Sequence, residues 1–193
     1  MVEFLLDLDK QLLLLINGLN APWLDEGMVV LTNGLSWLPL FLLVIGWMIY
    51  KLHWQSVIVI VAVVLVIILA DRISAGLLKP MIGRLRPSHE PGLKDLLHLV
   101  NDYRGGLFSF VSSHAANAFG IATILWLILR KQITWIWVMF LWATFFSYTR
   151  IYLGVHYPSD VIAGGILGAL LGLMIYKLLS FLPAKINPNL STN

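Results

Sequence analysis

The sequence has 193 residues, of which 59% are hydrophobic and only 12% are charged. Soluble domains carry about 25% charged residues, so this composition predicts an integral membrane protein built as one domain. The absence of cysteine excludes disulfides, thiolate nucleophiles and cysteine-bound metals, and a net charge of +3, scattered along the chain, indicates no nucleic-acid partner.

Residues 1–20 contain an apolar stretch, 4–16, that is too short to cross a bilayer. A membrane span needs about 20 apolar residues, and Asp7, Asp9 and Lys10 interrupt this stretch. We therefore expect an N-terminal amphipathic helix that lies in the membrane interface.

Residues 21–182 contain five longer apolar segments, and each of them predicts a membrane-spanning helix. These segments are 28–50, 57–78, 113–129, 134–153 and 158–182. Asn33-Gly34 and Pro39 predict a kink in the first of them. The sequence thus predicts an all-α integral membrane protein, a five-span helical bundle preceded by the interfacial helix and followed by a disordered tail, 183–193.

Residues 79–111 form the one long polar connection between these segments. Long loops in compact proteins usually bind or cover something. Four apolar positions within it, Leu93, Leu96, Leu97 and Val100, are compatible with one short helix that faces the membrane.

Three glycines, Gly164, Gly168 and Gly172, recur at four-residue spacing in the last apolar segment. Small residues at this spacing let two helices approach closely. The partner helix belongs either to the same bundle, which we favour, or to a second copy of the chain in a dimer.

Three polar clusters fall on one face of the membrane when the five spans alternate in direction. The first cluster, at 79–87, places Lys79 and Arg86 seven residues apart, with Arg84 between them. The second opens the helix at 113–129, where Ser112 is suited to cap the helix. The free N–H groups of such a helix start form an anion site.

The third cluster, at 149–160, concentrates charge between two apolar segments. Pro158 suits the first turn of a helix, which places Asp160 within reach of the His156 imidazole. A carboxylate behind a histidine fixes its tautomer and makes the far nitrogen a better nucleophile. Arg150 offers a planar fork of donors to an oxyanion. By themselves, these residues fit a capped helix with an interfacial histidine equally well.

Together the three clusters supply cations, a helix N-terminus, two histidines and one carboxylate, which is the chemistry that phosphoryl transfer needs. We expect no metal site, because the acidic residues do not cluster and the spacing matches no usual ligand motif. Asp71 and Arg72 either support the site or form a local buried pair.

The clusters resemble the signature of the type 2 phosphatidic acid phosphatase superfamily, which reads K-x6-R-P, then P-S-G-H, then S-R-x5-H-x3-D. The stretch 79–87 matches the first part, and Arg150, His156 and Asp160 match the third, with a threonine in place of its serine. In the middle part Val111 replaces the proline and Ser113 the glycine.

This resemblance implies that His156 is a nucleophile that forms a phosphohistidine, that Asp160 orients it, and that His114 protonates the leaving oxygen. It also implies that Lys79, Arg86, Ser112, Ser113 and Arg150 hold the phosphoryl oxygens. Relatives of this kind use no metal or other cofactor.

The resemblance implies a membrane lipid phosphatase, and we favour undecaprenyl diphosphate as its substrate because that activity is frequent in the family. Phosphatidylglycerophosphate, phosphatidate and lipid A phosphates are alternatives. A non-catalytic anion or lipid binder, or a transporter, is the competing class, but binding alone needs neither a nucleophile nor an acid. The Lys/Arg bias of the short connections predicts a bacterial inner-membrane protein with its site on the periplasmic face.

Overall fold

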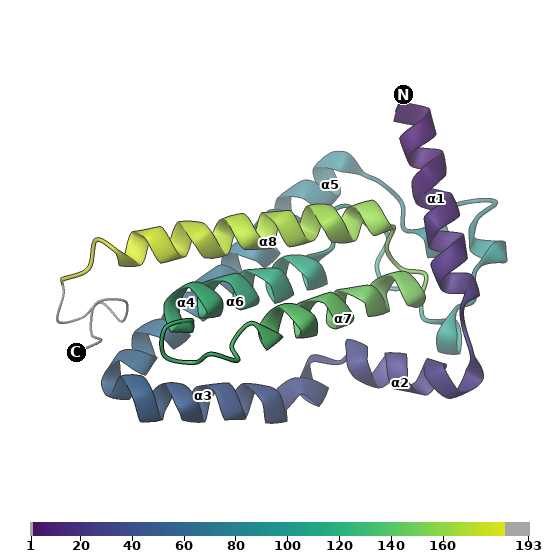
Figure 1. Ribbon diagram of the computed structural model, residues 1–193. Coiled ribbons are helices and arrows are strands. Elements are labelled where there is room, and N and C mark those ends of the chain that lie inside the picture. Colours follow the sequence, from purple (N-terminus) through teal and green to yellow (C-terminus); the bar gives the residue numbers. More distant parts are fainter. Residues whose placement is uncertain (1, 184–193) are drawn as a thin grey trace.

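The computed structural model describes residues 2–183 and shows an entirely helical architecture within them (Figure 1). The single sheet-like contact in this part of the chain is a bridge between Leu85 and Phe108. The predicted disordered tail, 183–193, lies outside the described residues from position 184 onward.

Helices account for nearly all the structure outside one long loop. The α-helices are α1 (Val2–Gly18), α2 (Pro22–Thr32), α3 (Leu38–Leu52), α4 (Ser56–Asp71), α5 (Lys79–Ile82), α6 (Ser113–Leu129), α7 (Val138–Tyr152) and α8 (Pro158–Leu179). Short 3-10 turns occupy Gly34–Trp37, His53–Gln55, Pro87–His89, Lys94–Leu96 and Val100–Asp102. A π-helical segment, Arg72–Leu78, joins α4 to α5.

Helices α3, α4, α6, α7 and α8 overlap the five predicted apolar segments, but the first segment, 28–50, is divided between the end of α2 and α3. The predicted kink is present: α2 ends at Thr32, the Asn33 side chain accepts a hydrogen bond from the Leu35 backbone N–H at 3.0 Å, and Pro39 lies in the first turn of α3. Figure 1 shows α3, α6, α7 and α8 running along the bundle, α4 crossing obliquely behind α6 and α8, and α1 standing across the end at which α8 begins.

Helix α6 is the central helix, and it packs against α4, α7 and α8. The glycine positions of α8 make the closest of these contacts, because a Cβ at Gly168 would lie 2.0 Å from the Ala116 carbonyl oxygen. A Cβ at Gly164 would lie 2.4 Å from the Ser112 carbonyl oxygen. The ladder of Gly164, Gly168 and Gly172 therefore packs against α6 of the same chain, which is the partner that the sequence analysis favours.

Large apolar side chains cover the outside of the bundle. On α4 these include Val57, Val61, Leu65 and Ile68, each about half exposed. A continuous apolar surface of this kind needs a non-aqueous surrounding. Two helical stretches, Gly34–Ile82 and Pro158–Leu179, are long and apolar enough to cross a membrane, and the apolar helix α6 is somewhat shorter.

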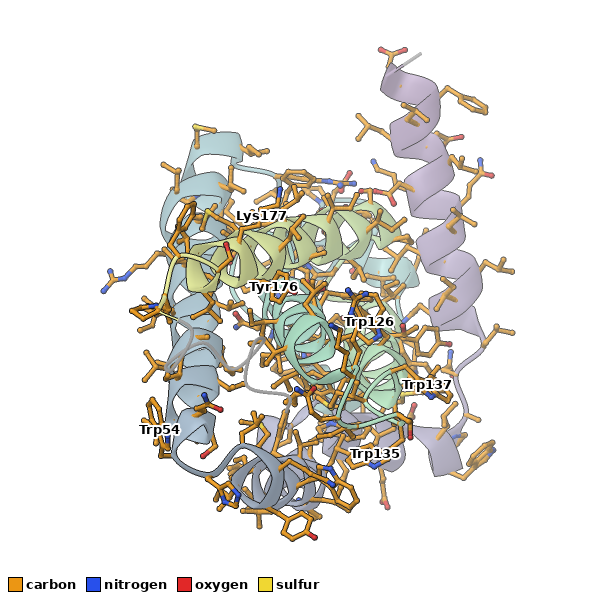
Figure 2. The ribbon with its side chains drawn as sticks, turned by 60° about the vertical axis from the view of Figure 1, so that its left-hand side comes forward. Trp54, Trp126, Trp135, Trp137, Tyr176 and Lys177 are labelled. Carbon is orange, nitrogen blue, oxygen red and sulfur yellow. The ribbon has the colours of Figure 1, made fainter. Side chains whose placement is uncertain are left out.

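Aromatic and basic side chains gather at the end of the bundle remote from α1. Figure 2 looks towards this end and labels Trp54, Trp126, Trp135, Trp137, Tyr176 and Lys177. The Lys51 ammonium lies 5.3 Å from the Tyr50 ring centroid, and the Arg130 guanidinium lies 4.7 Å from the ring of Trp126. Tryptophan, tyrosine and basic residues at helix ends are typical of a membrane–water interface.

The long loop differs from its prediction. The four apolar positions at 93, 96, 97 and 100 do not form one helix facing the membrane, because two of them are buried inside the protein. Leu93 is buried and packs with Leu13 of α1, and Val100 is buried against Met28 of α2. The loop consequently follows short turns that connect α1 and α2 to the rest of the fold.

Candidate active site

The predicted site residues converge at the end of the bundle next to α1. Each comes from a different element: Lys79 from α5, Arg86 from the loop, Ser112 to His114 from the start of α6, Arg150 from the end of α7, His156 from the following link and Asp160 from α8. Helix ends that meet in this way bring distant parts of the sequence together on a rigid frame.

The start of α6 is capped as the sequence predicts. The Ser112 hydroxyl accepts a hydrogen bond from the Ala115 backbone N–H at 3.4 Å, and the Ser112 N–H donates to the Asp160 carbonyl at 3.0 Å. The Ser113 hydroxyl, in the position of the usual glycine, accepts from Lys79 Nζ at 3.2 Å and from the Ser74 hydroxyl at 2.8 Å. This serine thus orients the lysine.

His156 and Asp160 form a buried pair at the start of α8. Asp160 Oδ2 lies 3.4 Å from His156 Nδ1 and accepts the Tyr157 backbone N–H at 2.9 Å. Burial, together with the positive charges of Arg86, Arg150 and Lys79, holds the pKa of His156 well below its ordinary value. The imidazole is therefore neutral near pH 7, and its Nε2 is the nitrogen left for nucleophilic attack.

Arg86 is fixed by backbone carbonyls. Its Nε donates to the Phe108 carbonyl at 3.1 Å and its Nη1 to the Val155 carbonyl at 3.3 Å. Gly105, at φ +67°, lies so close that a Cβ there would be 2.6 Å from Nη1. Burial and the neighbouring Arg150 lower the pKa of Arg86 to about 10, which leaves it charged at neutral pH.

Arg150 is almost fully buried and has spare hydrogen-bonding capacity. Its Nη1 donates to the Thr32 hydroxyl at 2.7 Å and its Nη2 to the Tyr103 hydroxyl at 3.1 Å. Its Nε has no hydrogen-bond partner within the described residues. A buried, unpaired donor beside a second guanidinium costs free energy that a bound anion would recover.

His114 lies between a polar cavity and an apolar one. Its ring stacks on Phe146 at a centroid distance of 5.4 Å, and it interacts electrostatically with His156. The polar cavity, about 580 Å³, is lined by residues such as Arg150 and Arg104, and the apolar cavity, about 450 Å³, by residues such as Trp142. The histidine thus lies where a phosphate on an apolar tail would join the two.

Sequence reasoning missed the role of Arg84, which lies in the first cluster. Its Nη1 donates to Asp160 Oδ1 at 3.0 Å, and its Nη2 donates to Asp9 Oδ2 of α1 at 2.7 Å. Asp9 had appeared only as an interruption of an apolar helix. A charge within an apolar segment is functional by default, and that signal was available in the sequence.

Asp71 and Arg72 do not form the local buried pair that was one of their two interpretations. Both side chains are exposed, and Asp71 accepts a hydrogen bond from Asn117 Nδ2 at 2.9 Å. Asp71 also lines the apolar cavity beside His114.

An all-helical membrane protein with two histidines, a buried carboxylate and several cations at one end has the features of a membrane phosphatase. Residues 55–183 match the family model of the PAP2 superfamily. The chain belongs to this family and is a membrane lipid phosphatase, a phosphoric monoester hydrolase.

Known phosphatases are similar to this chain in sequence and in structure. The chain is 42% identical over 188 residues to the lipid A 4'-phosphatase of Bacteroides thetaiotaomicron, which covers 96% of this chain and 83% of that protein. The crystal structure of Aquifex aeolicus LpxE has a TM-score of 0.64 and 30% identity, covering 86% of this chain and 93% of the other. The transmembrane PAP2 type phosphatidylglycerolphosphate phosphatase of Bacillus subtilis has the same fold, with a TM-score of 0.68 at 23% identity over 93% and 88% of the two chains.

Proposed function

We propose that the chain removes a phosphate from a lipid through a phosphohistidine at His156. The observation that carries this proposal is the buried His156–Asp160 pair, with Nδ1 and Oδ2 3.4 Å apart, beside the charged side chains of Arg86, Arg150 and Lys79. A binding protein would not need a neutral imidazole backed by a carboxylate.

In the first chemical step, His156 Nε2 forms a bond to phosphorus while the bond from phosphorus to the lipid oxygen breaks. His114 donates a proton to that leaving oxygen, and Asp160 stabilises the positive charge that develops on the imidazole of His156. In the second step, a water molecule attacks phosphorus, His114 takes up a proton from the water, and the bond between Nε2 and phosphorus breaks. The products are the dephosphorylated lipid and inorganic phosphate.

Lys79, Arg86, Ser112, Arg150 and the Ser113 amide would hold the phosphoryl oxygens during both steps. These groups neutralise charge as a divalent metal ion does in other phosphatases. The reaction therefore needs no cofactor.

We propose a lipid A phosphate as the substrate, in place of the undecaprenyl diphosphate expected from the sequence. That expectation rested on the frequency of the activity in the family, whereas the lipid A 4'-phosphatase of Bacteroides thetaiotaomicron is 42% identical over nearly the whole chain. The polar cavity of about 580 Å³, lined by Arg104, Tyr103 and Asn101 among others, suits a phosphorylated sugar. The adjoining apolar cavity suits the start of an acyl chain.

We further propose that α3, α4, α6, α7 and α8 cross a bacterial inner membrane, and that the site faces the periplasm. The exposed apolar side chains of the bundle and the aromatic and basic side chains at its far end support this arrangement. Helix α1 would then lie in the interface, because it stands across the site end of the bundle (Figure 1).

Phosphate release by the detergent-solubilised protein from four lipids tests the proposal. The panel consists of lipid A 1,4'-bisphosphate, undecaprenyl diphosphate, phosphatidylglycerophosphate and phosphatidate. We expect loss of the 4'-phosphate of lipid A to have the highest kcat/KM. A higher kcat/KM for another lipid would refute the substrate, and binding without any release would refute catalysis by this chain.

A further inference from the structure

The carboxylate of Asp9, on α1, caps α8, the helix that begins just after His156 and carries Asp160. Its Oδ1 accepts the Ser159 backbone N–H of α8 at 2.9 Å, and its Oδ2 accepts the Ser159 hydroxyl. The first N–H groups of a helix have no partner within that helix and bind a carboxylate well. Helix α1 therefore supplies a cap to α8 from 150 residues away in the sequence.

Arg84 connects this cap to the catalytic carboxylate. Its Nη1 donates to Asp160 Oδ1 at 3.0 Å and to the Ser159 hydroxyl at 2.9 Å, and its Nη2 donates to Asp9 Oδ2 at 2.7 Å. The guanidinium carbon also lies 3.7 Å from the centroid of the Tyr157 ring. Because a guanidinium is planar and rigid, these three hydrogen bonds and one stacking contact leave it a single orientation.

A second set of contacts joins α1 to the segment between α7 and α8, which contains His156. Glu90 accepts hydrogen bonds from Lys10 of α1 and from the Tyr157 hydroxyl. Leu13 of α1 is fully buried, and the Asn17 side-chain amide donates to the Tyr152 carbonyl at 2.7 Å. These contacts show that one side of α1 is docked on the protein at the residues that flank His156.

The two carboxylate oxygens of Asp160 have different partners. Oδ1 receives Arg84, and Oδ2 receives the Tyr157 N–H and faces His156 Nδ1. The Ser109 side chain also donates a hydrogen bond to this carboxylate, and Arg84 at Oδ1 acts with these donors to restrain its rotation. The orientation of Oδ2 towards His156 therefore depends in part on where Arg84 is held.

We propose that Asp9 and Arg84 are positioning residues that aim Asp160 at His156, so that α1 is part of the catalytic apparatus rather than a membrane anchor alone. This inference rests on the proposed roles of His156 and Asp160. Neither new residue is required to touch the substrate. Their loss should therefore lower kcat and leave KM nearly unchanged.

Arg84 should also affect the pH dependence of turnover. The charged and titratable groups around His156 are Lys79 of α5, Arg86 of the loop, His114 of α6, Arg150 of α7 and Asp160 of α8. Without Arg84, the negative charge of Asp160 is less neutralised and favours the imidazolium form of His156. The acid limb of kcat/KM should then move to higher pH, a shift that simple loosening of the fold would not produce.

The experiment compares Asp9→Asn, Arg84→Gln, Arg84→Lys and the Asp9→Asn/Arg84→Gln double variant with the full-length protein in detergent. Asp7→Asn is the matched control, because Asp7 lies on the same helix and is exposed. Within residues 2–183, the hydrogen bond that its carboxylate accepts comes from Gln11, on α1 itself. The readouts are kcat and KM on the best lipid of the panel above, the pH profile, and the affinity for orthovanadate measured by calorimetry.

We expect kcat to fall at least tenfold in Asp9→Asn and further in Arg84→Gln, with the double variant no worse than Arg84→Gln alone. Arg84→Lys should keep the wild-type pH profile but not the wild-type kcat. Each loss should be matched by weaker vanadate binding, and Asp7→Asn should behave as wild type. Wild-type kcat and vanadate affinity in Arg84→Gln, or additive losses with an unshifted acid limb, would overturn the inference.

The vanadate measurement separates this inference from the proposed function. A wild-type protein that binds vanadate but hydrolyses no lipid would refute the proposed function, while equal vanadate affinity in all variants would refute the positioning role.

Discussion

Nδ1 of His156 faces Oδ2 of Asp160 at 3.4 Å, in a place where both side chains are almost completely shielded from water. Because this contact occupies Nδ1, we infer that Nε2 is the proton-free nitrogen of the neutral ring, the atom to which the proposed mechanism gives the attack on phosphorus. The start of α8 creates the contact, since Pro158 begins the helix and Asp160 caps it through the Tyr157 N–H.

Substitution of either site histidine should remove turnover and leave the fold intact. We expect kcat for phosphate release to fall at least about 10³-fold in His156→Ala and His114→Ala, as is usual when a nucleophile or a general acid is lost. Circular dichroism and size-exclusion chromatography in detergent would verify the fold. Wild-type kcat in purified His156→Ala would show that the nucleophile is another residue.

The pH dependence of the wild-type protein should reflect the buried imidazole. Burial and neighbouring cations lower the pKa of His156, so its neutral, nucleophilic form persists below the pH at which an exposed histidine becomes protonated. Activity should fall only as the pH drops through that lowered value. The acid limb of a kcat/KM profile should therefore lie below about pH 6.5. An acid limb above pH 7 would contradict the assignment of His156 as the neutral nucleophile.

Activity should survive chelation of metals and should be inhibited by vanadate. Within the described residues, no three His, Asp or Glu side chains gather as a metal site, and the cations supply the charge instead. Phosphate release in EDTA should equal that in its absence. Orthovanadate should inhibit competitively by bonding to His156, and a complete loss of activity in EDTA that Mg²⁺ restores would refute the metal-free mechanism.

The contact between α6 and α8 should tolerate no added side chain at Gly168. A Cβ there would lie 2.0 Å from the Ala116 carbonyl oxygen, which belongs to rigid helix backbone. We expect Gly168→Ala to lower the free energy of unfolding by about 1–3 kcal/mol or more. The measurement is thermal unfolding in detergent.

Gly46→Ala is the control for that prediction, because a Cβ at Gly46 would meet nothing within 4 Å and alanine favours a helix. The control should unfold at or above the wild-type temperature. Equal unfolding temperatures for Gly168→Ala and wild type would mean that the helices are not packed this closely.

Membrane orientation can be tested with reporters fused after Asn193. The Lys/Arg bias of the short connections predicts that the C-terminus is cytoplasmic and the site lies outside. A C-terminal fluorescent protein should therefore be bright and a C-terminal alkaline phosphatase inactive. The reverse pattern would place the site on the cytoplasmic side and remove the reason to expect a substrate from the outer leaflet.

The sequence was sufficient to predict the elements whose causes are local. The start of α6 at Ser113 and of α8 at Pro158 follow from a capping serine and a helix-starting proline, and the kink before Leu38 follows from Asn33-Gly34. The spacing of His156 and Asp160 predicted their contact for the same reason, since four residues across a helix start fix a short distance.

Features that depend on distant contacts could not be read in this way. Arg84 reaches Asp9 across 75 sequence positions, and no local pattern identifies that partner. The apolar positions of the long loop predicted one short helix. Instead, Leu93 packs with α1 and Val100 packs with α2. The glycine ladder was equally compatible with two partners, and only the packing of α6 shows which one fills it.

The most direct test of the account is to trap the phosphorylated enzyme. Full-length protein mixed with ³²P-labelled lipid phosphate and quenched in alkali within milliseconds should retain label, because phosphohistidine is stable in alkali and labile in acid. Peptide mass spectrometry should then place the phosphate on His156, and His156→Ala should retain none. Label on another residue, or turnover without any labelled enzyme, would contradict the proposal that His156 is the nucleophile.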